Sequence, residues 1–399
     1  MCPKRRAGST PVSGTEKLIN VGFFYFSQTL NSPMKIQLVE PYFTGSHKQW
    51  AEGYQNSSRH NIKILSIKGQ FWKWRMHGGA VTLAHQFNDS DWDPDLLLVT
   101  DMLDLSTFLA LTRNKSQRTP AAIYFHENQL VYPWSPDDRD LKQKRDTHYG
   151  FINYVSALVA DKVFFNTKFH MDSFLEALQP FLKQFPDNNE LDSIPIIRNK
   201  SEVLHLGIEL KKYDKHKVER MGKPLILWNH RWEYDKNPDL FFSILKKIKN
   251  DGYGFKLAVI GENFSQYPEI FEKARITFQD NIVQWGYIGS FKQYAEWLWK
   301  ADILPVTSNQ EFFGVSVMEA IYCQTWPILP NRLSYPELIP NRMHKEHLYS
   351  NDQELYKMIV QCIIDFNKIK SEKFTRIAKK FDWDTMSGNY DSLMGKLPE

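Results

Sequence analysis

Cysteine is scarce in this sequence, whose 399 residues include only Cys2, Cys323 and Cys362. These positions have neither the spacing of a zinc site nor the density of a disulfide-stabilised small domain. They indicate reduced thiols. We therefore expect a cytoplasmic protein held together by a packed core rather than by covalent cross-links.

A long apolar run is also missing: no stretch reaches the ~18 residues that a membrane-spanning helix needs. Basic residues at 4–6 precede a short apolar run at 21–26, which loosely imitates a secretory signal. No cleavage site of small residues follows that run. We expect residues 1–33 to be a disordered extension, with the fold beginning at Met34 and no contact with a membrane.

Strong charge of either sign is absent, because 50 Lys and Arg residues oppose 46 Asp and Glu residues, for a formal net charge of +4. Such a charge does not argue for nucleic acid by itself, and it does not oppose an anionic partner. The His, Cys, Asp and Glu residues show no metal-ligand spacing, and no Ser-His-Asp triad is evident. Aromatic residues, in contrast, make up 14% of the chain. They suit a large core and also surfaces that stack on sugars or bases.

Short apolar runs alternate with helix-like segments along the whole chain, which predicts an α/β fold with parallel, doubly wound sheets. The charged stretch 211–220 is the best linker candidate, and residues 183–200 are polar enough to predict a surface loop. Two Rossmann-like domains would then face each other across a cleft. We expect an N-terminal domain at 34–210, a C-terminal domain at 221–380, and a last helix in 381–399 that packs back on the N-terminal domain. The strands are expected at 36–39, 62–67, 96–99, 121–125, 162–165 and 203–205 in the first series and at 224–228, 255–261, 281–286, 302–306 and 326–330 in the second.

Two glutamates, Glu311 and Glu319, flank seven residues where a buried strand passes into a helix. In an open α/β sheet this junction lies at the carboxyl end of a strand, where ligands bind. The start of the helix offers free backbone N–H groups that suit phosphate or sugar oxygens. Both carboxylates can accept hydrogen bonds from hydroxyl groups of one ligand. Alternatively, Glu311 caps the helix and Glu319 faces solvent.

Other strand ends also carry polar or flexible residues. Gly45 opens a helix after the first strand and permits close approach of a ligand to the backbone. His126 ends the fourth strand, where an imidazole can bind a sugar hydroxyl or orient a reacting group. Arg231 and Lys236 follow the first strand of the second series, and two cations there would neutralise a diphosphate without a metal. An ordinary turn, a structural histidine and solvated loop charges are the alternatives.

The segment 71–79 alternates aromatic rings with cations, as in surfaces that stack bases and hold phosphates. Alternatively, its tryptophans pack inward as part of a helix while Lys73 and Arg75 stay in solvent.

Taken together, these motifs resemble the retaining glycosyltransferases of family 4, which have the two-domain GT-B fold. The resemblance extends from Met34 to the C-terminus, with one departure at Phe312, where the family commonly has glycine. It is carried by the E-x7-E motif at 311–319, by Arg231 with Lys236, by His126, and by the segment 381–384 before a last helix.

Within that family, the segments 42–49, 125–133 and 165–174 look like the tRNA-queuosine α-mannosyltransferases. This resemblance implies GDP-mannose as the donor, the queuosine of a tRNA anticodon as the acceptor, and no metal or other cofactor. The segments all lie in the first domain, which is the acceptor side of this architecture. No obligate protein partner is implied.

The resemblance also implies roles for individual residues. Glu319 would bind the donor ribose, Arg231 and Lys236 the leaving diphosphate, and His126 the sugar from the opposite domain. The residues expected to act in catalysis are His126, Arg231, Lys236 and Glu311. The residues expected to bind the donor are Gly45, Arg231, Lys236, Tyr287, Ile288, Glu311, Phe313, Gly314, Val315 and Glu319. The residues expected to bind the acceptor or its RNA are Ser46, His47, Trp72, Trp74, Arg75, Asn128 and Gln129, with Lys73, Lys142, Lys144 and Arg145 as further cations.

Two other functions stay open. Another family 4 transferase would act on a lipid, polysaccharide or small-molecule acceptor, and residues 71–76 would then face a membrane. A protein of a different class would bind RNA or a nucleotide on the same scaffold without catalysis.

Overall fold

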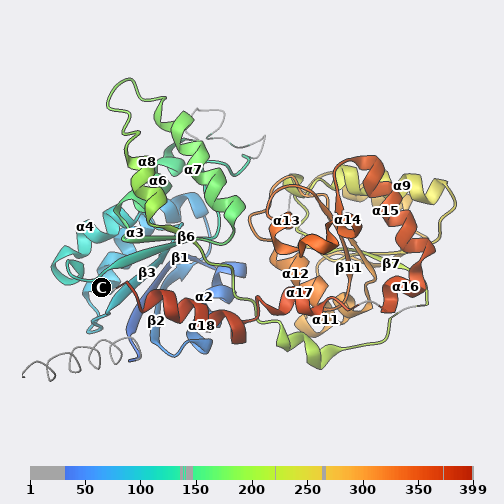
Figure 1. Ribbon diagram of the computed structural model, residues 1–399, viewed down its shortest axis with the longest axis horizontal. Helices are drawn as coiled ribbons and strands as arrows, with labels where there is room; N and C mark the ends of the chain where they lie inside the picture. The colour runs from blue at the N-terminus through green and yellow to red at the C-terminus, as the bar shows by residue number, and fades with distance from the viewer. Residues whose placement is uncertain are drawn as a thin grey trace, which may run out of the picture.

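The protein consists of two lobes, each built on one six-stranded sheet, in the computed structural model (Figure 1). The structure describes residues 32–134, 138, 140, 147–220, 222–262, 267–371 and 373–397, so the expected extension at 1–33 lies almost wholly outside the described residues. All strand pairs in both sheets are parallel. The expected doubly wound α/β architecture is therefore confirmed.

The first lobe contains a sheet with the strand order β2-β1-β3-β4-β5-β6. Strands β3 and β4 are buried at every position, because helices cover both faces of a parallel sheet. The strands are β1 (Lys35–Phe43), β2 (Asn61–Lys68), β3 (Leu96–Thr100), β4 (Ala121–Phe125), β5 (Lys162–Phe165) and β6 (Ser201–Val203). The helices are α2 (Gly45–Ser57), α3 (Trp72–Asn88), α4 (Leu105–Ser116), α6 (Thr147–Val159), α7 (Lys168–Leu182) and α8 (Ser193–Asn199).

The prediction of a surface loop at 183–200 is wrong in its second half, where α8 forms. Ile197 on this helix is fully buried in the core of the first lobe. The hydroxyl groups of Tyr154 and Ser193 are hydrogen-bonded at 2.8 Å and fix the start of the helix. Pro195 is compatible with this helix because it lies in the first turn, where its missing N–H has no helical partner to lose.

The second lobe contains a sheet with the strand order β12-β11-β10-β7-β8-β9. Its short edge strand β12 was not expected from the sequence. The strands are β7 (Leu225–Trp228), β8 (Lys256–Val259), β9 (Ile282–Trp285), β10 (Ile303–Pro305), β11 (Trp326–Pro330) and β12 (Leu348–Tyr349). The α-helices are α9 (Pro238–Asn250), α10 (Ile270–Thr277), α11 (Phe291–Lys300), α12 (Val315–Tyr322), α13 (Tyr335–Leu338), α14 (His344–His347), α15 (Asp352–Ile364), α16 (Phe366–Ser371) and α17 (Thr375–Lys379). The 3-10 helices are η1 (Lys211–His216), which occupies the expected linker, η2 (Tyr234–Lys236) and η3 (Asn341–Met343).

The chain crosses between the lobes twice, and the two crossings are hydrogen-bonded to each other. The backbone N–H of Ile208 donates to the carbonyl of Phe381 at 2.8 Å, and that of Trp383 donates to the carbonyl of Ile208 at 3.1 Å. The last helix, α18 (Trp383–Met394), then lies against α2 of the first lobe (Figure 1). There the Trp50 indole N–H donates to the Tyr390 hydroxyl at 2.9 Å. Both crossings thus tie the ends of the second lobe to the first.

The contact between α2 and α18 gives a stability prediction. A Cβ atom on Gly53 would lie 2.0 Å from Nε1 of Trp383, which is itself buried. We expect Gly53→Ala to lower the free energy of unfolding by about 1–3 kcal/mol, because the indole must move. Gly388→Ala in α18 is the matched control, since its Cβ meets nothing within 4 Å. Thermal or urea unfolding of the two variants measures the difference; equal stabilities would contradict this packing.

Among the described residues, no helix is long and apolar enough to cross a bilayer.

Candidate active site

The expected site residues lie at the carboxyl ends of strands, beside the point in each sheet where the strand order reverses. In the first lobe that point lies between β1 and β3, and in the second between β7 and β10. Ligands of open α/β sheets bind at such points, because the loops on either side diverge and leave a crevice. His126 follows β4, Lys236 lies in the loop after β7, and Glu311 follows β10. The topology therefore accounts for their grouping.

Lys236 is the buried cation of the second lobe, with only 7% of its surface exposed. Its Nζ lies 3.3 Å from Oε2 of Glu311 and 3.1 Å from Oδ2 of Asp235, and it donates to the Gln310 carbonyl at 3.1 Å. Burial lowers the pKa of Lys236, but the two carboxylates outweigh burial and hold this pKa above its usual value. The ammonium is therefore a fixed positive charge at neutral pH.

Arg231 supplies a second positive charge at the boundary between the lobes. Its Nη2 lies 3.2 Å from Oε2 of Glu233 and 3.5 Å from the hydroxyl of Tyr132 in the first lobe. Burial lowers the pKa of Arg231, and the neighbouring Tyr132 and Glu233 raise it by more, so the guanidinium stays charged. The structure thus places both expected cations in one loop that faces the first lobe.

The two glutamates of the E-x7-E motif are neither a helix cap nor a solvent-facing charge. Gly314, with φ of +92°, is the N-cap of α12, and Glu311 instead pairs with Lys236. Glu319 has only 7% of its surface exposed, and its Oε2 accepts a hydrogen bond from the Tyr294 hydroxyl at 2.9 Å. Burial raises the pKa of Glu319, opposed by hydrogen bonds from tyrosine hydroxyls. The two alternatives left open by the sequence are therefore wrong.

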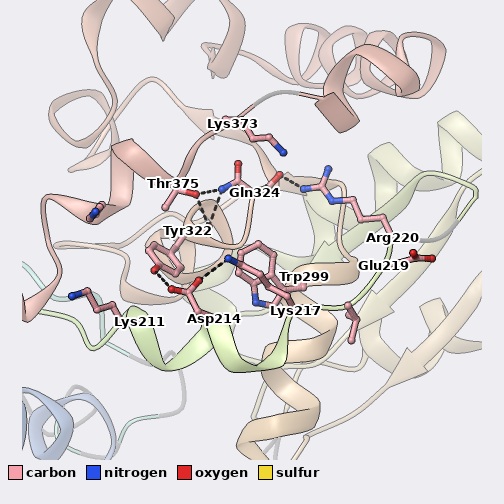
Figure 2. Close-up of a pocket in the computed structure, with 12 residues that line it drawn as sticks. Lys211, Asp214, Lys217, Glu219, Arg220, Trp299, Tyr322, Gln324, Lys373 and Thr375 are labelled. Atoms are coloured by element: carbon pink, nitrogen blue, oxygen red, sulfur yellow. Dashed lines mark hydrogen bonds and ion pairs between the residues drawn. The ribbon is translucent and has the colours of Figure 1, made fainter.

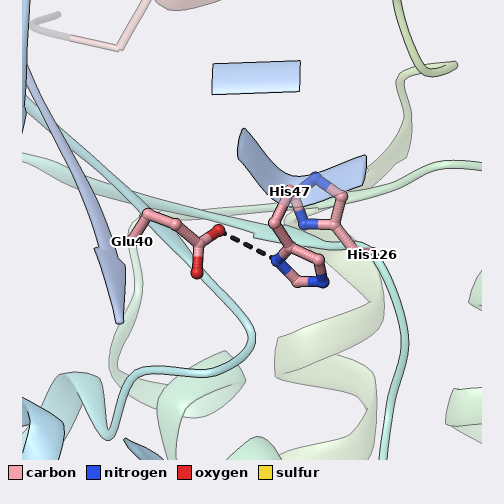
Figure 3. Close-up of side chains that lie close together, drawn as sticks. All are labelled: Glu40, His47 and His126. Atoms are coloured by element: carbon pink, nitrogen blue, oxygen red, sulfur yellow. Dashed lines mark hydrogen bonds and ion pairs between the residues drawn. The ribbon is translucent and has the colours of Figure 1, made fainter. Parts of the chain in front are cut away.

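In the first lobe, His126 belongs to a buried cluster with His47 and Glu40 (Figure 3). His47 Nδ1 lies 2.9 Å from Oε2 of Glu40, and the two imidazole rings are 4.2 Å apart between centroids. The backbone N–H of His126 donates to Asp101 Oδ1 at 2.8 Å, and Nδ1 of the ring lies 3.4 Å from the same oxygen. Neither ring nitrogen of His126 makes a hydrogen bond within the described part of the chain.

The charges in this cluster are unequal. Burial lowers the pKa of His47, but Glu40 reverses the shift and raises this pKa to about 9. Burial lowers the pKa of His126 well below its usual value, and the positive His47 lowers it further. At neutral pH, His47 is therefore an imidazolium paired with Glu40, while His126 is a neutral imidazole with free polar atoms.

The same three side chains form the one candidate metal-ligand group in the described residues, with ligand atoms within 4.8 Å of one another. Two imidazoles and a carboxylate suit a divalent cation. The Glu40–His47 hydrogen bond already uses one atom of each of these residues. The sequence pattern did not indicate this cluster, and the absence of a metal cofactor stays a prediction.

Phe312, the departure from the family pattern, connects the lobes. The side chain is 4% exposed and stacks on the His170 ring of α7 at 4.0 Å. Its carbonyl accepts a hydrogen bond from the Thr167 hydroxyl at 2.8 Å. Glu337 of the second lobe also accepts from the backbone N–H groups of Lys168 and Phe169, at 3.0 and 3.2 Å. The loop between Glu311 and α12 is therefore held against the start of α7.

The residues of α3 that were expected to face RNA differ in how far the protein itself already engages their side chains. Trp72 packs on Tyr149, 5.1 Å between ring centroids, and Lys73 pairs with Asp138 and Asp140 at 2.6 Å each. Trp74 is 64% exposed. Arg75 Nε donates to the carbonyl of Lys68 at 3.1 Å. Lys142, Lys144 and Arg145 lie outside the described residues.

The remaining expected residues lie around the lobe boundary. Gly45, with φ of +51°, leaves open space where a Cβ would be, so a ligand can approach this backbone closely. Ser46 and Val315 line one cavity of about 170 Å³ between α2 and the crossing segments. Asn128 is fully buried, and its Oδ1 accepts from the N–H groups of Leu130 and Val131 at 3.2 Å. These hydrogen bonds show that Asn128 stabilises the turn after β4. The expected ligand contacts of Gln129, Tyr287 and Ile288 stay predictions.

The sequence interpretation missed Glu40 and Asp101, and it placed His47 with the acceptor rather than beside His126. Glu40 is the residue that a strand-end argument would have found, since an acidic side chain near the end of β1 faces the same crevice. Asp101 directly follows β3 and carries the same signal; burial raises its pKa to about 7.

The fold is also that of known glycosyltransferases. Sucrose-phosphate synthase from Thermosynechococcus elongatus superimposes with a TM-score of 0.64 at 14% identity, covering 90% of this chain and 98% of that structure. HepE of Anabaena, solved in complex with UDP and glucose, gives a TM-score of 0.59 at 15% identity, covering 91% of this chain and 100% of that one. A model for glycosyl transferases group 1 matches residues 211–381. The chain is a glycosyltransferase of the GT-B fold.

The first lobe narrows the class further. Residues 35–208 match the family model for the N-terminal region of tRNA-queuosine alpha-mannosyltransferase. The enzyme of that name from Drosophila melanogaster is 34% identical over 334 residues, 81% of this chain and 85% of that protein. A probable sucrose-phosphate synthase from Thermosipho melanesiensis is 24% identical over 231 residues, 54% of this chain and 53% of that protein. The chain belongs to the tRNA-queuosine alpha-mannosyltransferase family.

Proposed function

We propose that this enzyme transfers mannose from GDP-mannose to the queuosine nucleoside of a tRNA anticodon, with retention of the anomeric configuration. The observation that carries the proposal is the match of residues 35–208 to the N-terminal region of that family, because this lobe is the acceptor side of the architecture. The second lobe supports sugar transfer, since it matches the general group 1 transferases.

In the proposed mechanism, the second lobe binds and activates the donor. Lys236 and Arg231 stabilise the diphosphate as negative charge develops on the leaving group, an effect that is large in a site with little water. Glu319 accepts hydrogen bonds from the ribose hydroxyl groups. Glu311, with the backbone N–H groups of residues 313–315, holds the sugar. These groups lie after the carboxyl ends of β7 and β10 or on α12, where Glu319 is in the second turn.

The first lobe supplies His126, whose free ring atoms meet the sugar from the opposite side. A neutral imidazole can accept or donate a hydrogen bond, whereas an imidazolium would only donate and would repel an oxocarbenium-like transition state. The charge on His47 therefore has a function in this proposal, because it adds to the effect of burial in lowering the pKa of His126 and keeping this ring neutral. The acceptor proton passes to the leaving phosphate, so no second catalytic carboxylate is required. Closure of the two lobes excludes water, which otherwise competes as the acceptor.

The direct test is to incubate the protein with queuosine-containing tRNA and GDP-mannose and to analyse the nucleosides by mass spectrometry. The expected product is queuosine with one added hexose, formed only when both substrates are present. The controls are tRNA that lacks queuosine, and UDP-glucose in place of GDP-mannose. Transfer to a lipid or free sugar, but not to tRNA, would show that the acceptor is wrong.

We further propose that the enzyme acts in the cytoplasm. We also propose that its domain limits are at 34–210, 221–380 and 381–399. The two cysteines in the described residues support the first part, since Cys323 and Cys362 are buried free thiols rather than a disulfide.

A further inference from the structure

A cavity of about 970 Å³ lies outside the strand-end site, and Figure 2 shows the residues that line it. Segments that are far apart in the sequence form it: η1 and the linker after it, the ends of α11 and α12, and the region of α17. Its lining combines cationic side chains with two aromatic rings. The residues used below are Lys217, Arg220, Trp299, Tyr322, Lys373 and Lys379.

Positive charge is concentrated in the two segments that form most of this lining. Residues 211–223 and 368–380 together contain twelve Lys and Arg residues against three Asp and Glu residues, a net charge of +9. The whole chain has a net charge of only +4, so the remainder is net negative. A concentration of this kind is the electrostatic signature of a polyanion site.

Some of these cations are neutralised inside the protein and others are not. Lys217 pairs with Asp214 at 3.0 Å and lies 5.0 Å above the Trp299 ring, and Arg220 lies 3.7 Å from Asp302. Lys373 and Lys379 are exposed, and neither ammonium forms an ion pair with a carboxylate of the described residues. The cavity therefore has free positive charge at its edge, and the rings of Trp299 and Tyr322 are part of its lining.

This cavity is close to the donor half of the site. Tyr322 follows Glu319 on α12 by three residues, about 4.5 Å along the helix axis. The η1 helix contacts both residues. The Tyr322 hydroxyl donates to Asp214 at 3.0 Å, and the neighbouring Tyr213 is near enough to Glu319 that burial and this carboxylate together raise the pKa of Tyr213. A long anionic substrate engaged at the cleft could therefore reach Lys373 and Lys379.

We propose that this cavity binds the sugar-phosphate backbone of the RNA acceptor, through Lys373 and Lys379 in particular. The inference rests on the proposed function, which makes an RNA the acceptor. Charge complementarity favours a polyanion over a small metabolite, because the free charges of Lys373 and Lys379 are exposed at the edge of the cavity and not enclosed within it. The α3 cations contribute less, since Lys73 is already paired with two carboxylates.

The test measures binding of a fluorescent, unmodified tRNA transcript by anisotropy as the salt concentration is varied. In the double variant Lys373→Glu, Lys379→Glu, we expect at least a ~10-fold loss of affinity near 0.1 M salt. The slope of log Kd against log salt should fall by about 2, since each lost phosphate contact removes just under one unit. Because both side chains are exposed, the melting temperature should not change.

Lys246→Glu is the matched control, because it reverses an exposed charge on α9, at the far side of the same lobe (Figure 1). This variant should bind tRNA as the unmodified protein does. Wild-type affinity and slope in the double variant would overturn the inference. So would a loss of stabilisation by GDP-mannose without any loss of tRNA binding, since the cavity would then be a small-anion site.

The two proposals can fail separately. If the protein binds the transcript through these lysines but adds no hexose to queuosine, the proposed function is wrong and the RNA site stands. If hexose transfer occurs while the double variant keeps full tRNA affinity, the RNA site is wrong and the function stands.

Discussion

Replacing Lys236 with alanine is expected to lower the turnover number by ~10²-fold or more, the usual effect of removing a group that stabilises transition-state charge. Lys236 is a buried ammonium in the loop after β7, and the nearby carboxylates of Glu311 and Asp235 keep it charged. In the proposed mechanism, this charge is therefore in place before the diphosphate begins to leave. Turnover is measured as hexose transfer at saturating donor, so that weaker donor binding is reported separately by KM.

Removal of this ammonium also leaves two carboxylates without their cation, so stability must be measured on the same samples. Lys249→Ala is the matched control: it removes a partly buried lysine of the same lobe that donates to the Thr277 carbonyl at 2.7 Å. We expect this control to keep nearly full turnover. A folded Lys236→Ala protein with turnover within a few-fold of the unmodified enzyme would exclude the assigned role.

The free energy of unfolding is expected to fall as pH rises from about 6.5 to above 9, because His47 loses its proton in that range. Its pKa is about 9 in the folded protein, above the ordinary value of 6.5. A raised folded-state pKa stabilises the protein fully below the unfolded-state pKa, and this contribution is lost as pH rises through the folded-state pKa. With about 1.4 kcal/mol for each pKa unit, the loss is at most about 3.5 kcal/mol.

Urea unfolding at pH 7 and pH 9.5 measures this effect when the unmodified protein is compared with His47→Gln. The variant should be less stable at pH 7, and its stability should depend less on pH. His85→Gln, an exposed histidine on α3, is the control and should follow the unmodified protein. An unchanged pH dependence in His47→Gln would show that His47 and Glu40 do not form a charged pair.

The fold could be predicted almost completely from the sequence, because parallel strands buried on both faces are continuous apolar runs. The expected runs at 96–99, 121–125 and 326–330 correspond closely to β3, β4 and β11. The location of Lys236 and Glu311 beside each other also follows from topology, since both come at the carboxyl ends of neighbouring strands. Periodicity and position at a strand end are local signals in the sequence, and they are sufficient to predict the strands and the proximity of Lys236 to Glu311.

The remaining features depend on contacts between distant segments. Nothing near His47 in the sequence shows that its ring stacks beside His126, or that Glu40 raises its pKa. Similarly, Lys73 appeared to be an available RNA contact, because Asp138 and Asp140 are far from it in the sequence. The basic cavity joins residues 211–220 with 373–379, which are far apart in the sequence and lie beside the two hydrogen-bonded crossings of the chain.

The position of Phe312 links donor affinity to the angle between the lobes. Its ring is held by His170, and its neighbour Glu311 belongs to the proposed donor site. Any hinge motion that separates α7 from this loop must therefore strain the groups that hold the sugar. By thermodynamic reciprocity, a donor that orders the loop shifts the equilibrium towards the joined lobes by the same free energy. The aromatic residue in place of glycine would thus make the donor an effector of lobe closure, and release of the spent nucleotide the step that reopens the enzyme.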